Sequence, residues 1–411
     1  MYDRVNVDRT INMTESSHPW IAAAEAAGIL GVIRTTLYAY VSRGYVRSQA
    51  LPGSTRERAY SREDVERLRR RTEERRAPDK AAARALHWGM PTLESRITLI
   101  DGRRLYYRGL DAAVLARSRS LEEVAGLIWT GGFETAGAAA PDIPWRHSRL
   151  PFTARAHAAL AAAGADEPMA FDLRARSVAR SGLRILRLLT SAGTNASFDG
   201  ATVDAALARA WKVASRGVDV VRAALVLCAD HELNVSAFTA RCVASAGAHP
   251  YAVVIAGLAA LEGPRHGGAA ARVESMLQSL RHARPLRAAL GARMRRGEAV
   301  DGLGHPLYRD GDPRARLLLD LLGERYAASA EYRFVMEFVR AASAITGEHP
   351  NIDLGLAAVE RVLKLPPGSA LILFAVGRSV GWIGHAIEQY ATGQLIRPRA
   401  KYVGVLPPAA E

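Results

Sequence analysis

Residues 261–277 read LEGPRHGGAAARVESML and place His266 between an arginine and two glycines, directly before a stretch of helical composition. Glycines occur where a backbone or a ligand must approach closely, because glycine has no side chain. The N-terminus of a helix carries a partial positive charge, which disfavours the protonated form of a histidine placed beside it. We therefore expect a neutral imidazole at His266, in a position that a ligand can reach.

Other residues with catalytic or binding chemistry follow in similar settings. His231 lies in ADHELN, His305 is bracketed by glycine and proline in GLGHPLY, and Asp353 lies in HPNIDLGL. Arginine pairs bidentately with carboxylates, which lysine cannot do. Each of these residues alone has an ordinary structural explanation, but together they favour a joint role. The arginines that accompany them are Arg314, Arg378 and Arg397.

Composition restricts the classes of function. A length of 411 residues is sufficient for two or three domains, and a net charge of +14 favours anionic partners such as nucleic acid or coenzyme A. The bias toward arginine and alanine is also what a GC-rich genome would produce. The two cysteines have no metal or redox spacing, and the longest apolar runs are shorter than a membrane span. We expect a cytoplasmic protein with no signal peptide, membrane partner, metal or redox cofactor.

The N-terminal part has the proportions of two short helices followed by a wing. A helix is predicted over Trp20–Leu30, where Gly31 breaks it, and a second helix follows with Gly44 just past its end. The segment YVRSQALPGSTRERAYS is rich in turn residues and predicts a two-stranded wing. Ser61 can cap a further helix after the wing.

This pattern resembles a known class of DNA-binding domain. EAAGILGVIRTTLYAYVSRGYV resembles the helix-turn-helix of MerR-type regulators, and RAYSREDVERL resembles the segment after their wing. The resemblance implies a winged helix-turn-helix domain at residues 20–76, between a flexible terminus (1–19) and a linker (77–91), with DNA as a partner. Ile33 stands where such motifs usually carry a capping serine or threonine. The alternative is a helical module retained for packing. The candidate DNA contacts are Arg34, Thr35, Thr36, Tyr38 and Arg43.

From residue 92 the chain changes character. SRITLIDGRRLYYRGLD predicts a hairpin with Asp101–Gly102 at its turn, and alanine- and leucine-rich helical patterns dominate after Leu121. These patterns predict a mainly α fold for the long C-terminal part.

The C-terminal histidines, arginines and Asp353, together with LYYRGLDAAVLA and SLEEVAGLIWTGGFE, resemble citrate synthase over residues 92–411. The resemblance implies a mainly α, two-domain helical fold that works as a homodimer. The large domain would comprise residues 92–265 and 360–411, and the small domain residues 266–359. The cleft between them would close over the substrates.

The same resemblance implies acyl-CoA and oxaloacetate as substrates and assigns three catalytic residues. Asp353 would remove a proton from the acyl group, a very weak carbon acid, while His266 donates to the thioester oxygen. His305 would polarise the ketone of oxaloacetate and protonate its oxygen. Water would then hydrolyse citryl-CoA, without a metal or redox cofactor.

The resemblance also implies which residues bind the substrates. His231, Arg314, Arg378 and Arg397 correspond to residues that bind oxaloacetate, and Arg397 would reach across from the partner subunit of the homodimer. The segment that lines the adenine of coenzyme A corresponds to Val300, Asp301, Gly302, Leu303 and Gly304.

The sequence departs from the family pattern beside the catalytic residues. Arg265 replaces a leucine, Ala270 an asparagine, and Leu354, Gly355 and Leu356 replace Phe-Tyr-Ser. A pocket that differs by a methylene discriminates only about 10- to 200-fold, so acetyl-CoA and propionyl-CoA both remain open as the acyl donor.

Two other functions also remain open. The chain could be a transcriptional regulator with a dimeric metabolite-sensing body, or a lyase that cleaves citryl-CoA.

Overall fold

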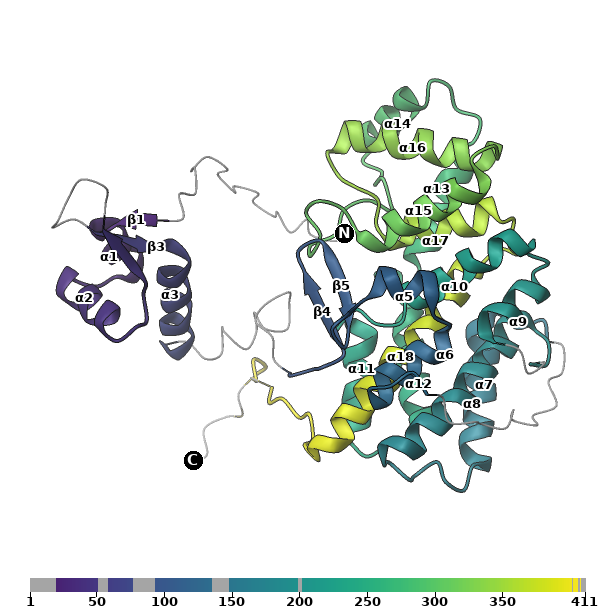
Figure 1. Ribbon diagram of the computed structural model, residues 1–411, viewed down its shortest axis with the longest axis horizontal. Helices are drawn as coiled ribbons and strands as arrows, with labels where there is room; N and C mark the ends of the chain where they lie inside the picture. Colours follow the sequence, from purple (N-terminus) through teal and green to yellow (C-terminus); the bar gives the residue numbers. More distant parts are fainter. Residues whose placement is uncertain are drawn as a thin grey trace. The chain divides into compact units, whose positions relative to one another are not determined.

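A computed structural model of the protein describes residues 20–50, 58–76, 93–134, 148–198, 202–400, 402–405 and 407 (Figure 1). The chain forms two compact units, residues 1–94 and 95–411. The predicted flexible terminus and the whole of the predicted linker lie outside the described residues.

The N-terminal unit combines short helices with a small antiparallel sheet in the order β1-β3-β2. The predicted first helix begins later than expected: residues 20–22 form a strand, in which Ile21 pairs with Tyr60. A helix start at Trp20 is therefore wrong, because this pairing holds the backbone extended. The elements are β1 (Trp20–Ala22), α1 (Ala23–Leu30), α2 (Arg34–Ser42), β2 (Ser48–Ala50), β3 (Arg58–Ser61) and α3 (Arg62–Arg76).

Local signals in the sequence explain where these elements end. Gly31 ends α1 in the left-handed region at φ 63°, and α2 begins after Ile33 without a side-chain cap. Two paired strands are present where the sequence predicts them, as the antiparallel pair β2–β3, and Oγ of Ser61 accepts the Asp64 N–H at the start of α3. A small core that includes Leu37 holds these elements together.

The C-terminal unit opens with an antiparallel sheet of β4 (Thr98–Asp101), β5 (Arg104–Tyr107) and β6 (Leu110–Asp111). The predicted hairpin is present, but its turn is shifted by one residue: Asp101 pairs with Arg104, so the loop is Gly102–Arg103. The reason is conformational, since Gly102 adopts φ 55°, which glycine takes at the first loop position without strain.

Where the structure describes the rest of the unit, its secondary structure is helical, as predicted. The helices are α5 (Ala112–Ser118), α6 (Leu121–Thr130), α7 (Phe152–Asp166), α8 (Ala175–Thr194), α9 (Val203–Ala210), η1 (Ser215–Gly217), α10 (Val218–Leu227), α11 (Val235–Ser245), α12 (Pro250–Leu261), α13 (Ala269–Leu280), α14 (Leu286–Arg295), α15 (Pro313–Tyr326), α16 (Ala330–Thr346), α17 (Ile352–Val362) and α18 (Ser369–Thr392).

Helix α18 is the central helix of this unit, and α6, α8, α10, α11 and α12 pack against it (Figure 1). Among the described residues it is the one helix long and apolar enough to cross a membrane, but 89% of its most apolar window is buried inside the unit. Its apolar character is therefore accounted for by packing. Helices α13–α17 pack on one another, and α17 also contacts α18.

Candidate active site

Two histidines and a tyrosine pack together in the loops beside α10 and α15. His231 follows α10, and His305 and Tyr308 precede α15. The ring centroids of His231 and His305 are 5.1 Å apart, and the Tyr308 hydroxyl lies 3.0 Å from Nε2 of His231. Burial lowers the pKa of His231, and the charges of Arg314 and Arg378 lower it further, so the ring is neutral at pH 7.

The backbone fixes the tautomer of His305. The N–H of Leu307 donates to Nδ1 of His305 over 3.2 Å. Burial and then the charge of Arg314 lower the pKa of His305 to about 4. A neutral His305 therefore carries its proton on Nε2, which suits it to donate to a ligand oxygen.

Arg314 lies in the first turn of α15 and is held by a buried carboxylate. Its Nε and Nη2 donate to Oδ1 and Oδ2 of Asp312 over 2.9 and 2.7 Å, and both side chains are almost fully buried. Asp312 also caps α15 and accepts the N–H of Ile352 over 3.0 Å. One carboxylate thus connects the arginine to the start of α17.

A second buried arginine comes from the central helix. Nε of Arg378 donates to the carbonyl oxygen of Cys228 over 2.7 Å, and its guanidinium carbon lies 4.7 Å from the centroid of the Phe374 ring. Only 1% of Arg378 is exposed. A buried guanidinium of this kind can bind a carboxylate strongly, because little water competes for it.

Asp353 lies in the first turn of α17. Asn351 caps the helix, and its Oδ1 accepts the Asp353 N–H over 3.1 Å. Burial raises the pKa of Asp353 to about 6, although the charge of Arg314 acts in the opposite direction. A carboxylate with a raised pKa is a stronger base than an ordinary aspartate and is still ionised at pH 7.

His266 lies between α12 and α13, two residues before Gly268, the N-cap of α13. Burial, followed by the charge of Arg378, lowers its pKa to about 4. Its Nε2 lies 2.8 Å from Oγ of Ser236, which also lies 2.9 Å from Oδ1 of Asn234. The hydroxyl has one proton for these two acceptors. When it donates to Nε2, a neutral His266 keeps its proton on Nδ1 and can donate it to a ligand.

All but one of the predicted catalytic and oxaloacetate-binding residues form one electrostatic cluster. The charges of the two buried arginines reach the three histidines and the aspartate and change their pKa values. Arg397 is the exception, because it is exposed in the segment that follows α18. The cluster consists of His231, His266, His305, Arg314, Asp353 and Arg378.

The segment predicted to line the adenine forms the loop before α15. The Gly304 N–H donates to the carbonyl oxygen of His349 over 2.8 Å, and Gly302 and Gly304 adopt φ 85° and 74°. A pocket of about 360 Å³ lies beside this loop, and Val300, Leu303 and Glu348 are among its lining residues. Arg272 pairs with Asp301 over 3.1 Å, which ties the loop to α13.

Sequence reasoning missed several side chains that hold this cluster. Tyr308 and Ser236 contact the predicted histidines, and Phe374 lies against both His266 and Arg378. Asp312 had a usable signal, since Asp before Pro at a helix start indicates a cap. The others had no signal for their contacts with His231 and His266, because those histidines are distant from them in sequence.

Comparisons with known proteins agree with this architecture. Residues 85–171 and 194–399 match the family model described as "Citrate synthase, C-terminal domain". Among curated proteins, citrate synthase 2 of Bacillus subtilis is 36% identical over 190 residues, 46% of this chain and 51% of that protein. The 2-methylcitrate synthase of Shewanella oneidensis is 32% identical over 192 residues, again 46% and 51%. The chain thus spans about half the length of the curated relatives it matches.

Solved structures show the same fold. The citrate synthase of Thermoplasma acidophilum, in a ternary complex with carboxymethyl coenzyme A and oxaloacetate, aligns with a TM-score of 0.68 at 24% identity. The alignment covers 78% of this chain and 96% of that one. The citrate synthase of Thermotoga maritima aligns with a TM-score of 0.61, over 79% and 96% of the two chains. Residues before 85 lie outside the matched family model.

Proposed function

Since the chain belongs to the citrate synthase family, we propose that it condenses an acyl-CoA thioester with oxaloacetate, and that water then hydrolyses the citryl-CoA product to release coenzyme A. The observation that carries this proposal is the position of Asp353. It is a carboxylate whose pKa is raised by burial, within reach of the charges of Arg314 and Arg378, and burial together with these charges keeps three histidines neutral. Removing a proton from the carbon next to a thioester carbonyl needs such a base together with a neutral hydrogen-bond donor to the carbonyl oxygen.

The first step forms an enolate at the acyl group. Asp353 takes a proton from the carbon next to the thioester carbonyl, and Nδ1–H of His266 donates to the carbonyl oxygen as charge develops there. In this step the Ser236 hydroxyl, whose Oγ lies 2.8 Å from Nε2 of His266, would turn its proton from Oδ1 of Asn234 to that Nε2. A neutral imidazole is suited to this role because it stabilises the oxygen without leaving a charged site unpaired.

The second step forms the carbon–carbon bond. The enol carbon attacks the ketone carbon of oxaloacetate, and Nε2–H of His305 protonates the ketone oxygen. Arg314, Arg378 and His231 hold the carboxylates of oxaloacetate, and a homodimer would add Arg397 from the second copy. Hydrolysis of the thioester then yields coenzyme A and citrate, or 2-methylcitrate when the acyl group is propionyl.

The identity of the acyl group depends on the residues that follow Asp353. Leu354 and Leu356 are buried, and the Gly355 backbone packs against Ala315 of α15.

We test the reaction by mixing the protein with oxaloacetate and either acetyl-CoA or propionyl-CoA and following free thiol. Release of thiol that requires oxaloacetate supports the proposal, and the better donor identifies the product. No release with either donor contradicts it.

The pH dependence follows from the same groups. We expect kcat/KM for the acyl donor to fall about tenfold per pH unit below about pH 6. The pKa of Asp353 is raised to about 6 by burial, and only its ionised form can accept the proton. His266 and His305 do not interfere, because their pKa values of about 4 keep them neutral through this range. A profile that stays flat to about pH 5 would contradict Asp353 as the base.

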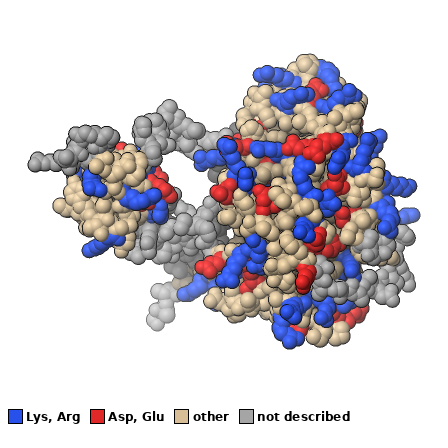
Figure 2. All heavy atoms as spheres, viewed as in Figure 1, with Lys and Arg blue, Asp and Glu red and all other residues tan. Residues whose placement is uncertain are grey.

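A second proposal concerns the N-terminal unit, which we propose binds duplex DNA through α2. Leu37 buries one face of α2, while Arg34, Thr35 and Tyr38 on the same helix are exposed. Arg43, just after the helix, is exposed as well. This is the division of faces that a recognition helix needs. On the face drawn in Figure 2, basic and acidic side chains are interspersed, so net charge alone marks no nucleic-acid surface there.

Salt dependence tests this proposal. If Arg34 and Arg43 contact phosphates, replacing either by alanine should weaken binding and reduce the slope of log K against log salt by about one. We would measure this by mobility shift with fragments from the protein's own locus. Arg67→Ala is the matched control, because Arg67 on α3 already pairs with Asp64 over 2.7 Å. No salt-sensitive shift, or the same slope in all variants, contradicts DNA binding through α2.

A further inference from the structure

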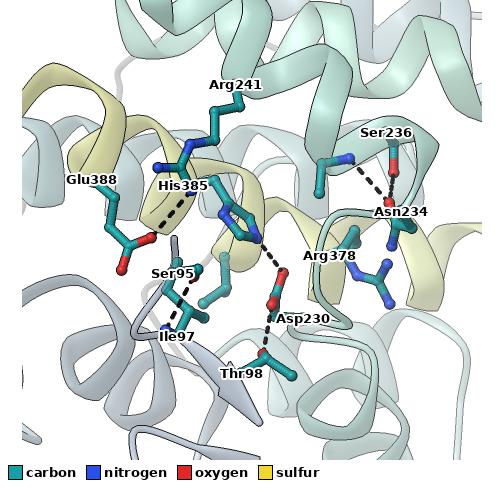
Figure 3. Close-up of polar contacts among 12 residues, drawn as sticks. Ser95, Ile97, Thr98, Asp230, Asn234, Ser236, Arg241, Arg378, His385 and Glu388 are labelled. Atoms are coloured by element: carbon teal, nitrogen blue, oxygen red, sulfur yellow. Dashed lines mark hydrogen bonds and ion pairs between the residues drawn. The ribbon is translucent and has the colours of Figure 1, made fainter. Parts of the chain in front are cut away.

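A second polar cluster lies next to His231 and Arg378, two of the predicted oxaloacetate-binding residues. It takes no part in the enolisation, condensation or hydrolysis proposed for the reaction. Asp230 and His385 are both fully buried, and Nε2 of His385 lies 3.2 Å from Oδ1 of Asp230. The Thr98 hydroxyl donates to the other carboxylate oxygen over 2.5 Å. Figure 3 shows His385 of α18 and Thr98 of β4 approaching the carboxylate from two different elements.

The carboxylate belongs to the turn that carries the site. Asp230 immediately precedes His231, and the carbonyl oxygen of Cys228 in the same turn accepts the Arg378 Nε–H. The N–H of Gly381 on α18 donates to the carbonyl oxygen of Ala229 over 2.9 Å. The turn therefore takes its position from α18 at three successive residues.

Glycine makes this close approach possible. A Cβ at Gly381 would lie 2.5 Å from the carbonyl oxygen of Ala229 and would also collide with the Asp230 carboxylate. A Cβ at Gly377 would lie 3.0 Å from Cβ of Cys228. The turn packs directly on the backbone of α18. Any displacement of the turn from the helix would therefore move both His231 and the Cys228 carbonyl that orients Arg378.

The charges in this region also depend on one another. Burial by itself would raise the pKa of Asp230, but His385, Arg378 and Thr98 together lower it below its ordinary value. Burial lowers the pKa of Arg378, and Asp230 acts against this shift. An ionised Asp230 thus compensates part of the charge of a buried guanidinium that forms no ion pair with a carboxylate in the described part of the chain.

From this arrangement we propose that Asp230 and His385 form a positioning pair that holds the 228–231 turn on α18, so that His231 and Arg378 face the same carboxylate of oxaloacetate. The inference rests on the proposed function, because it assigns oxaloacetate to these two residues. The pair does not touch the substrate and takes no part in proton transfer. Its expected signature is selective loss of oxaloacetate affinity.

The test compares His385→Asn, Asp230→Asn and the double variant with the wild type. We expect each single variant to raise KM and the dissociation constant for oxaloacetate between about tenfold and a hundredfold, since small misplacements of positioning groups have effects of this size. KM for the acyl-CoA should change less than about twofold, and the double variant should resemble the singles because the pair acts as one unit.

Glu388→Gln is the matched control. Glu388 also lies on α18 and links it to the segment before β4, since its Oε1 accepts the Arg96 N–H over 2.8 Å, but it makes no contact with the 228–231 turn in the described structure. It should leave KM for oxaloacetate unchanged. If His385→Asn also leaves that KM and the dissociation constant unchanged, or raises both substrates' KM values equally, the pair is structural only and the inference is wrong.

Binding of oxaloacetate alone, measured by calorimetry, separates this inference from the proposed reaction. A wild-type protein that binds oxaloacetate but releases no thiol contradicts the proposed reaction. The ratio of the variant's dissociation constant for oxaloacetate to that of the wild type still tests whether Asp230 and His385 act as a positioning pair. A wild-type protein that binds no oxaloacetate contradicts both. If Asp230→Asn fails to fold, His385→Gln, which keeps a polar side chain beside Asp230, provides the second measurement.

Discussion

Asp353→Asn is expected to lower kcat for coenzyme A release by about 10²- to 10⁴-fold, the range that general-base catalysis contributes. Asparagine is close in shape to aspartate but cannot accept the proton of the acyl group. The first turn of α17 should persist, because the contact that caps it uses the backbone N–H of residue 353 and not its side chain. Thiol release with the better acyl donor gives the rate constant.

The same substitution separates the base from binding. Dissociation constants for oxaloacetate should change little, since Asp353 is assigned to the acyl group. Asp320→Asn is the matched control, because Asp320 is an exposed aspartate on α15. If Asp353→Asn keeps more than about a tenth of the wild-type kcat, the assignment of Asp353 as base is wrong.

Arg314→Met is expected to lower the free energy of unfolding by about 3–5 kcal/mol and to abolish oxaloacetate binding. The substitution leaves the Asp312 carboxylate buried without the guanidinium that faces it at 2.7 and 2.9 Å. Breaking a buried ion pair on one side has a large effect because a charge remains out of water. Denaturant unfolding followed by circular dichroism measures the loss, and calorimetry measures binding.

Removing both charges distinguishes stability from function. The double variant Arg314→Met, Asp312→Leu should recover part of the lost stability, because no buried charge is left alone, but it should still bind no oxaloacetate. The double variant also loses the N–H acceptor for Ile352, so recovery should be incomplete. Arg316→Met is the control, since Arg316 is exposed on the same helix and surface changes are usually within about 0.5 kcal/mol. Equal stability of Arg314→Met and wild type would contradict the expected penalty.

Much of the architecture was accessible from the sequence because its signals are local. Gly31 and Gly44 bounded the two short helices of the N-terminal unit, and Ser61 marked the start of α3. Leucine and alanine patterns predicted a helical C-terminal unit. Two errors also have local causes: a three-residue strand resembles the first turn of a helix, and a loop glycine can occupy either position of a two-residue turn.

What sequence could not predict depends on contacts between distant residues. His385 faces Asp230 from a position 155 residues later in the chain, and no pattern in the sequence around it indicates this contact. Tyr308 lies against a histidine from another loop, and no pattern near it indicates this contact. The neutral state of His266 was expected from the adjacent helix terminus, but in the structure burial is the largest cause of its lowered pKa. Burial of this kind is a property of the assembled fold.

The several contacts of Asp312 have a consequence for local opening. This carboxylate accepts the Arg314 N–H at the start of α15, holds the Arg314 guanidinium and accepts the Ile352 N–H at the start of α17. Fraying of either helix start would remove some of these donors and leave the buried carboxylate only partly satisfied. The two helix starts should therefore open as one cooperative unit, so hydrogen exchange should give their amides a common opening free energy rather than one that differs from turn to turn.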